Sequence, residues 1–459
     1  MKILKNTALV AMAAGILFSC ENKETVTEAP ESNAEITIMS LDPGHFHAGL
    51  IHKSMYPQVD STVYVFAPEG AELQDYINRM SGYNSREEDP TAWDLQVSIG
   101  EDYLEKMISS KPGNVMMVAG KNDRKIDYIS ASVNNGIHVY ADKPLVINKD
   151  GFKKLLDAFA QAEQNDLLLY DIMTERFEIS TILQRELSMD PAVFGELEKG
   201  TLDNPAITKE SIHHFFKYVS GNPLIRPDWF FDTDIEGTGI VDVTTHLVDL
   251  IQWEAFPGVT LDTSDVQMQT AKLWSTEMDL EQFKQVTGKE DFSDFLRKNV
   301  SNDKLSVNSN GEMNYKLKGV HAKVSVIWNY QAPEGTADTH YSMMRGTKSN
   351  LIIQQGKAEN YVATLYVELL DGQDEALSAL VKEKLQDRFP GLDLEKMSDG
   401  KYKVIIPEKY HNGHEAHFAQ VTERYLEYFT SKNMPDWEVP NMIVKYFTTT
   451  EALEKAQEK

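Results

Sequence analysis

The sequence predicts an α/β protein in which a Rossmann-like domain with a parallel sheet precedes an α+β domain with a large, open and mainly antiparallel sheet. Between residues 36 and 170, short apolar runs alternate with helical stretches, the pattern of a doubly wound parallel sheet with right-handed crossovers. Beyond residue 170, the strands become longer and alternate between apolar and polar residues, as in antiparallel sheets with one covered face. A chain of 459 residues that is 41% hydrophobic is long enough for both domains.

The segment before the first domain indicates export. Two lysines precede an apolar run over residues 8–18, which is short for a membrane span and typical of a secretory signal. The run ends at Cys20, the only cysteine of the chain. We therefore expect residues 1–19 to be a lipoprotein signal peptide and the acylated Cys20 to anchor the protein to a membrane, on the periplasmic or cell-surface side. An ordinary signal peptide with a coincidental cysteine is the alternative, and the polar residues 20–35 are predicted to form a flexible tether.

Charge and cysteine content exclude some partners and some sources of stability. The formal net charge is −26, so nucleic acid and anionic lipid headgroups are poor partners. A single cysteine permits no disulfide within the chain. Stability must therefore come from the packed core.

The first domain, predicted over residues 36–170, consists of strands and helices in alternation. A Pro-Gly turn ends the first strand, and Pro68 ends the second. Residues 114–120 are apolar at successive positions, which is typical of a strand buried on both faces. The predicted strands are 36–39, 61–67, 114–120, 137–140 and 167–170, and the predicted helices are a stretch ending at 55, 103–110, 125–134 and 149–164.

The second domain, predicted over residues 171–459, combines long alternating strands with helices. No internal repeat is evident. The predicted strands are 211–218, 321–330, 350–355 and 361–369, and the predicted helices are 179–187, 241–254, 281–298, 376–389 and 416–430.

The strongest motif is the tripeptide Asp142-Lys143-Pro144, which directly follows a predicted strand. Open α/β sheets bind ligands at the carboxyl ends of their strands, so Lys143 is expected in the binding crevice. An exposed loop lysine beside a structural proline is the alternative. The tripeptide resembles the Glu-Lys-Pro signature of the Gfo/Idh/MocA family, the glucose-fructose oxidoreductase, inositol dehydrogenase and rhizopine catabolism proteins. Aspartate replaces the glutamate of that signature.

A second motif places two functional side chains on one helix. Asp242 and His246 are four residues apart and so share a helix face. They follow Gly237-Thr238-Gly239, which is similar to the Gly-Gly-Gly stretch of the same family. The resemblance implies that Lys143 lies between nicotinamide and substrate.

These three residues suggest a division of catalytic roles. His246 would be the base that takes the hydroxyl proton, and Asp242 would orient the substrate. Lys143 would polarise the hydroxyl oxygen, with its pKa lowered by a nearby cofactor cation. The alternative for His246 is a buried structural histidine.

The nucleotide fingerprint after the first strand is only partly present. A Gly-x-Gly-x-x-Gly turn normally brings the backbone to a pyrophosphate at a helix N-terminus. Here Met39 and Leu41 occupy the first two glycine positions, and only Gly44 and His47 match the end of the family pattern. Glu69, after the second strand, is a candidate for a ribose hydroxyl. The resemblance thus implies NAD or NADP, with a weakened fingerprint, bound by Gly44, His47, Glu69 and Lys143.

Two further clusters carry weaker signals. His411, His414 and His417 are spaced three apart, without the i, i+4 spacing of a helical zinc pair, so no metal site is predicted. A histidine-lined entrance to the substrate cleft or plain helix-start residues explain them equally well. The segment 345–348 resembles the family's Gly-Thr turn, although an ordinary hairpin turn is an equal alternative.

The leading hypothesis is an exported NAD(P)-dependent oxidoreductase that acts on a small sugar or polyol. Free nicotinamide is scarce outside the cytoplasm, so a tightly held cofactor and a redox-neutral reaction are expected. The alternative is a carbohydrate-binding lipoprotein that retains the fold without a cofactor. The resemblance spans nearly the whole chain and is to the Bacteroidetes lipoprotein variant with an oxidoreductase C-terminal domain. Family members commonly pair through open sheets, which implies a homo-oligomer.

Overall fold

The computed structural model describes residues 34–219, 222–333, 336 and 338–458. The predicted signal peptide, Cys20 and the tether up to residue 33 lie outside the described residues. Within the described part, no helix has both the length and the apolar character that a membrane span requires.

The first sheet has six parallel strands in the order β3-β2-β1-β4-β5-β6. Its strands are β1 (Ile36–Leu41), β2 (Val59–Ala67), β3 (Asp94–Ile99), β4 (Val115–Val118), β5 (His138–Asp142) and β6 (Leu169–Ile172). The helices between them are α1 (His47–Ile51), α2 (Ala71–Ser85), α3 (Tyr103–Ser110), α4 (Lys125–Asn134) and α5 (Lys149–Gln164). The Rossmann-like arrangement is confirmed, although α2 and β3 were not among the predicted elements.

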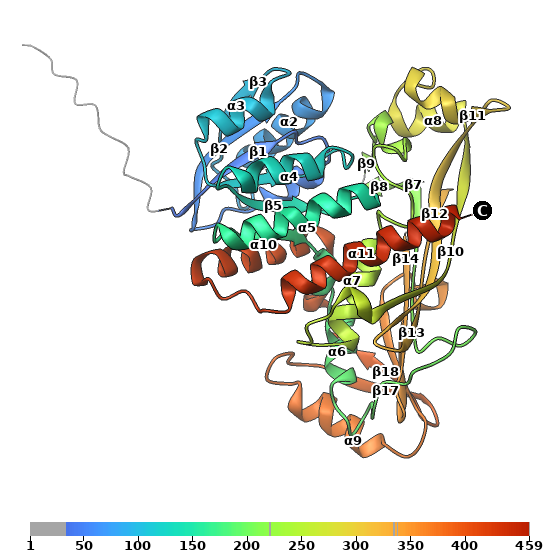
Figure 1. The fold of residues 1–459 in the computed structure, drawn as a ribbon. Coiled ribbons are helices and arrows are strands. Elements are labelled where there is room, and N and C mark those ends of the chain that lie inside the picture. Colours follow the sequence, from blue (N-terminus) through green and yellow to red (C-terminus); the bar gives the residue numbers. More distant parts are fainter. Residues whose placement is uncertain (1–33, 220–221, 334–335, 337, 459) are drawn as a thin grey trace, which may run out of the picture. The chain divides into compact units, whose positions relative to one another are not determined.

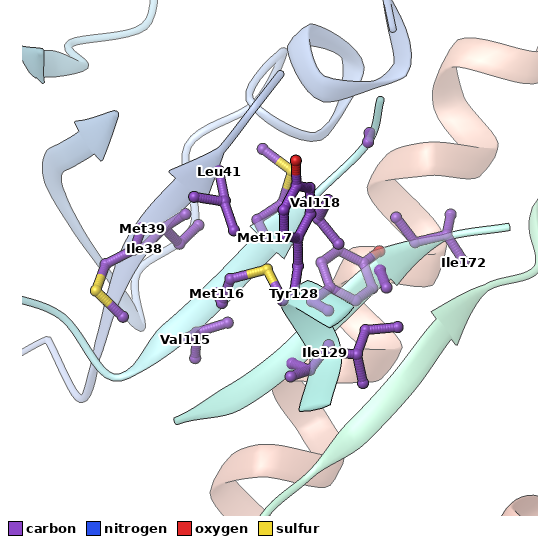
Figure 2. Close-up of a cluster of buried hydrophobic side chains, with 14 of the residues drawn as sticks. Ile38, Met39, Leu41, Val115, Met116, Met117, Val118, Tyr128, Ile129 and Ile172 are labelled. Atoms are coloured by element: carbon purple, nitrogen blue, oxygen red, sulfur yellow. The ribbon is translucent and has the colours of Figure 1, made fainter. Parts of the chain in front are cut away.

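The core of this sheet explains why its central strands are almost uniformly apolar. Both β1 and β4 are covered on each face, and all four residues of β4 are buried. Figure 2 shows Met39 and Leu41 of β1 beside Met116 and Val118 of β4. Such strands have no solvated face, so alternation is absent from their sequences.

The second sheet is the large, mainly antiparallel one that the sequence predicts. Its order is β10-β12-β13-β7-β14-β15-β16-β18-β17, with β11 paired to β12, and among the described ladders of this second sheet only β13 and β7 pair in parallel. The strands are β7 (Ile207–Phe216), β10 (Val266–Asp279), β11 (Val300–Ser301), β12 (Lys304–Leu317), β13 (Val320–Gln331), β14 (Thr339–Arg345), β15 (Ser349–Gln354), β16 (Thr364–Leu369), β17 (Asp393–Ser398) and β18 (Lys401–Ile405). A separate small ladder joins β8 (Tyr218–Val219) and β9 (Asn222–Pro223).

Helices cover one face of the second sheet. Apolar residues of α6 (Ile179–Ser188), α7 (Thr244–Ala255), α8 (Leu280–Thr287) and α9 (Asp374–Ala379) join the core beneath it. Short turns η1 (Thr174–Phe177), η2 (Asp228–Phe231), η3 (Thr263–Asp265), η4 (Asp294–Asn299), η5 (Lys357–Glu359), η6 (Leu380–Lys384) and η7 (Glu408–Tyr410) connect these elements. The predicted helix 281–298 is wrong in its second half, because α8 ends at Thr287 and Gly288 adopts a left-handed conformation with φ of 70°.

The last two helices return to the first sheet. Phe418 and Tyr425 of α10 (Gly413–Ser431) belong to the same buried cluster as the parallel strands. Helix α11 (Glu438–Gln457) contributes Tyr446 to that cluster and Leu453 to the core of the second sheet, and Figure 1 shows it extending towards β10. The domain boundary at residue 170 stays a prediction, but the end of the chain packs on both sheets.

A buried charge network connects these layers beside α7. Arg176 donates to both carboxylate oxygens of Asp249, at 2.6 and 2.7 Å, and to Glu438 at 3.0 Å. Lys445 contacts Asp249 at 2.9 Å and Asp171 at 2.7 Å. The network therefore holds α7 against β6, η1 and α11.

Candidate functional site

A cavity of about 1520 Å³ lies at the carboxyl edge of the parallel sheet. The loop between β1 and α1 and the residue after β5 line it from the first sheet, and the start of α7 lines it from the core of the second. Strands β7 and β13 of the second sheet provide further lining residues. The cavity thus lies where open α/β sheets bind ligands.

The three predicted catalytic residues meet in this cavity. Lys143 follows β5, and its Nζ forms an ion pair with Asp242 Oδ1. His246, one turn after Asp242, lines the same cavity, and its Nδ1 is buried without a hydrogen-bond partner among the described residues. The structure brings the three together, while their catalytic role stays a prediction.

The Gly-Thr-Gly segment explains how the backbone presents Asp242. Gly237 has a φ of 99°, a conformation that side-chain-bearing residues rarely adopt. A Cβ on Gly239 would lie 2.0 Å from the carbonyl oxygen of Ser309 on β12. The amide of Asp242 donates to the carbonyl of Thr238 at 3.1 Å, which begins the helical turn before α7. The glycines therefore let this turn contact the second sheet closely.

Burial and charge set the protonation states of the site. Burial lowers the pKa of Lys143, but the carboxylates of Asp242 and Asp142 outweigh it and raise that pKa above its ordinary value. The lowering of the Lys143 pKa that is expected beside a cofactor cation stays a prediction. Burial, assisted by the charge of Lys143, lowers the pKa of His246 to about 4, so this imidazole is neutral at pH 7. Burial and the charge of Asp242 raise the pKa of Glu236 well above its usual range.

A second polar cluster, composed of His45, His47 and Asp142, lies beside Lys143. His47 Nδ1 is 2.9 Å from Asp142 Oδ2, and His45 Nδ1 is 3.9 Å from the same oxygen. The buried Lys125 donates to the backbone carbonyl of Asp142 at 2.9 Å and so fixes the end of β5. Sequence reasoning identified His47 only as a cofactor residue and missed the other two members. The sequence did contain a signal for this cluster. The His-x-His pair follows β1, and Asp142 ends β5 of the same sheet.

The backbone after β1 does not form the usual pyrophosphate cradle. Strand β1 continues through Leu41, so the first two glycine positions of the fingerprint are buried strand residues. The amide of Gly44 donates to Asp42 O at 2.7 Å, and that of His45 to Ala119 O at 3.0 Å. The amide of His47 donates to His45 Nδ1 at 3.3 Å. Amides that would hold a pyrophosphate are therefore already hydrogen bonded within the protein.

Two of the four predicted cofactor residues lie away from the cavity lining. The ring of Trp229 lies 3.6 Å from the position that a Cβ on Gly44 would take. Glu69 is exposed after β2, and only His47 and Lys143 of the predicted set line the cavity. The residues present thus do not fit a dinucleotide bound through the fingerprint loop.

The two weaker motifs have structural explanations. His414 lines the cavity, with Nδ1 3.6 Å from Glu175 Oε1, whereas His411 and His417 are absent from the lining. One of the three histidines thus lines the cavity, and its role at an entrance stays a prediction. The segment 345–348 forms the turn between β14 and β15, where Gly346 donates to Ser349 at 2.9 Å.

The parallel sheet and the open second sheet together have the fold of the Gfo/Idh/MocA type. A family model described as "Putative oxidoreductase C terminal domain" matches residues 183–457. The chain belongs to the family that this model describes. No curated protein matches the chain.

Solved structures support both the family and the fold. A crystal structure of a "putative oxidoreductase from Parabacteroides merdae" is 52% identical, with a TM-score of 0.91, and the match covers 92% of this chain and 98% of that one. The fold is also similar to that of a "putative oxidoreductase from Thermotoga maritima", with 13% identity, a TM-score of 0.59 and coverage of 92% and 98%. It is similar, too, to levoglucosan dehydrogenase in complex with NADH and levoglucosan, with 12% identity, a TM-score of 0.57 and coverage of 92% and 97%. The last two show the fold alone.

Proposed function

We propose that the chain is an oxidoreductase that acts on a hydroxyl-bearing carbon of a small sugar or polyol bound in the cavity. The convergence of Lys143, Asp242 and His246 on one wall of that cavity carries the proposal. The likeness in fold to a levoglucosan dehydrogenase supports this substrate class. A polyhydroxylated ligand also suits a cavity with many charged and hydroxyl-bearing lining residues.

The side chains supply the proton transfer that such an oxidation needs. A neutral His246, which lines the cavity, accepts the proton of the reacting hydroxyl. The protonated Lys143 donates a hydrogen bond to the same oxygen and stabilises the negative charge that develops there. Asp242 holds the ammonium in place and is available to a neighbouring hydroxyl group.

NAD or NADP is the expected hydride acceptor for this family, and solved structures of the same fold hold NADH, NADP or NAD. In this chain, the amides after β1 do not fit the usual contact with a pyrophosphate. We therefore derive no hydride step through a dinucleotide from these residues.

The second candidate function is carbohydrate binding without a cofactor. The hydrogen-bonded amides of the β1–α1 loop favour it, because they leave the sugar cavity intact and remove the pyrophosphate site. Export and anchoring through Cys20 are proposed for either function. Labelling of expressing cells with radioactive palmitate should mark the wild-type protein and leave Cys20→Ala unmarked, and equal labelling would refute the anchor.

A mass spectrum of the purified, denatured protein separates the two functions. Released NAD(P), together with turnover of a sugar or polyol that His246→Ala abolishes while its circular dichroism is unchanged, supports the oxidoreductase. Sugar binding by calorimetry with no dinucleotide released or bound in titration supports the second candidate. A protein that binds neither a panel of sugars and polyols nor a dinucleotide refutes both.

A further inference from the structure

We propose that His45, His47 and Asp142 bind one divalent transition-metal ion at the wall of the cavity. Each residue offers one ligand atom, and the three atoms lie within 4.8 Å of one another. The proposal concerns binding of the ion and does not depend on the oxidoreductase activity proposed above.

The distances are close to those of a coordinated ion. Ligand atoms about 2.0–2.2 Å from a metal lie roughly 3–3.5 Å apart at tetrahedral or octahedral angles. Asp142 Oδ2 is 2.9 Å from His47 Nδ1 and 3.9 Å from His45 Nδ1. Movement of the His45 ring by less than about 1 Å brings the longer separation into this range, and the shorter one already lies just below it. The 3.3 Å hydrogen bond that His45 Nδ1 accepts from the His47 amide is long, so an ion replaces it at small cost.

Rigid elements hold the three residues. The amide of His45 is fixed to the carbonyl of Ala119 after β4, and the ring of His47 packs against Phe418 of α10, with centroids 4.7 Å apart. Asp142 ends β5, and its backbone carbonyl accepts a hydrogen bond from the buried Lys125. Metal sites require such support because outer contacts orient the ligands.

The cavity side of the cluster is open to a further ligand. The side chains of His45 and His47 are 16% and 12% exposed, and both line the cavity. Two imidazoles and one carboxylate on one side of an ion leave coordination positions for water or for hydroxyl groups of a polyol. The ammonium of Lys143 is paired with Asp242, which reduces its repulsion of a cation.

The ligand set also restricts the class of ion. Calcium and magnesium prefer sites made only of oxygen ligands. Imidazole together with carboxylate suits zinc, manganese, iron or cobalt. Zinc and cobalt are therefore the appropriate probes.

The test is direct metal binding by the untagged full chain after treatment with a chelator, in the absence of sugar. Titration with Zn²⁺ by calorimetry, and with Co²⁺ by visible absorption, should show one ion per chain. Asp142→Asn and His47→Gln should each lower the affinity at least about tenfold, with unchanged circular dichroism. His411→Ala, which removes an imidazole outside the cavity lining, should bind as the wild type does.

Anomalous scattering at the zinc edge from zinc-loaded crystals gives a second readout that needs no variant. A peak between His45, His47 and Asp142 supports the proposal. A peak only elsewhere, no stoichiometric binding, or wild-type affinity in both cluster variants overturns it. Because none of these measurements uses turnover, their failure leaves the oxidoreductase proposal unaffected, and the reverse also holds.

Discussion

Replacement of Arg176 by methionine should destabilise the protein more than any single change to its carboxylate partners. In the wild type, Arg176 and Lys445 face three carboxylates, those of Asp171, Asp249 and Glu438, and the side chains of all five residues are at most 8% exposed. Arg176→Met removes the guanidinium but keeps a side chain of similar length, which leaves three buried carboxylates against one ammonium. Removal of one partner from a buried ion pair costs about 3–5 kcal/mol. We therefore expect the free energy of unfolding to fall by an amount in that range at pH 7.

Asp249→Asn is the matched control for this prediction. It leaves two carboxylates against two cations, so the network, which has a net charge of −1 in the wild type, becomes neutral and loses only charged hydrogen bonds, at a cost of about 1–3 kcal/mol. Urea unfolding followed by tryptophan fluorescence measures both variants through their midpoints. A loss below about 1 kcal/mol for Arg176→Met, or a larger loss for Asp249→Asn than for Arg176→Met, would refute the charge argument.

The same network predicts a pH dependence. Burial raises the pKa of Asp249, but Arg176 and Lys445 outweigh it and hold that pKa well below the ordinary value. A carboxyl group with a lowered pKa in the folded state stabilises the fold above its unfolded pKa of about 3.9, and this stabilisation is lost as the pH falls towards the folded value. The difference in the free energy of unfolding between the wild type and Arg176→Met should therefore shrink below about pH 4. A constant difference down to pH 2 would count against this account of the network.

Further predictions concern the site and its backbone. Lys143→Met should lower kcat/KM on the sugar substrate by about 10²–10⁴-fold with Lys143→Arg recovering part of it, and equal rates for all three proteins would exclude the proposed role. Because the pKa of His246 is about 4, kcat/KM should fall as the pH decreases through that value, and the same fall in a His246→Asn variant would assign it to another group. Gly120→Ala should destabilise the fold by about 1–3 kcal/mol in urea unfolding, since its Cβ would lie 2.4 Å from Asp42 O. Gly82→Ala, which meets no atom within 4 Å in helix α2, should stabilise by about 0.5–1 kcal/mol, and the opposite order would contradict the steric argument.

The parallel sheet was predictable because burial on both faces leaves a strong signal in the sequence. Strands β1, β4 and β5 are nearly continuous apolar runs. Strand β3 lies at the edge of the sheet and is largely exposed, with apolar residues separated by polar ones. Its pairing with β2 depends on backbone hydrogen bonds formed only in the folded chain, so its sequence carries a weak signal.

The second sheet was predicted in kind but not strand by strand. Strands β10 and β12 pair over most of their length, yet the segment of β12 around Gly311 is rich in asparagine and serine. Gly311 contacts Ile240, where a Cβ would lie 2.5 Å from the isoleucine side chain. Tertiary contact, rather than local preference, therefore determines this strand.

The catalytic candidates and the histidine cluster differ in how they could be found. Asp242 lies in the turn directly before α7 and His246 in the first turn of that helix, so their spacing of four residues was enough to place them together. Asp142 and the two histidines are nearly a hundred residues apart in sequence, and only the order of the strands brings them to one edge. Such a cluster is visible only when the carboxyl ends of all strands in a sheet are compared.

One backbone arrangement of the β1–α1 loop cannot serve both a dinucleotide in the fingerprint loop and a metal ion at His45, His47 and Asp142. A pyrophosphate bound in the usual way would require the amides of His45 and His47 to turn towards it. That rotation would break the bond from the His45 amide to Ala119 O, which holds the backbone segment whose two rings face Asp142. An ion at the histidine cluster and a dinucleotide in the fingerprint loop must therefore weaken each other's binding, by the same factor in both directions. The extension of β1 through Leu41 favours the arrangement that faces the rings towards Asp142.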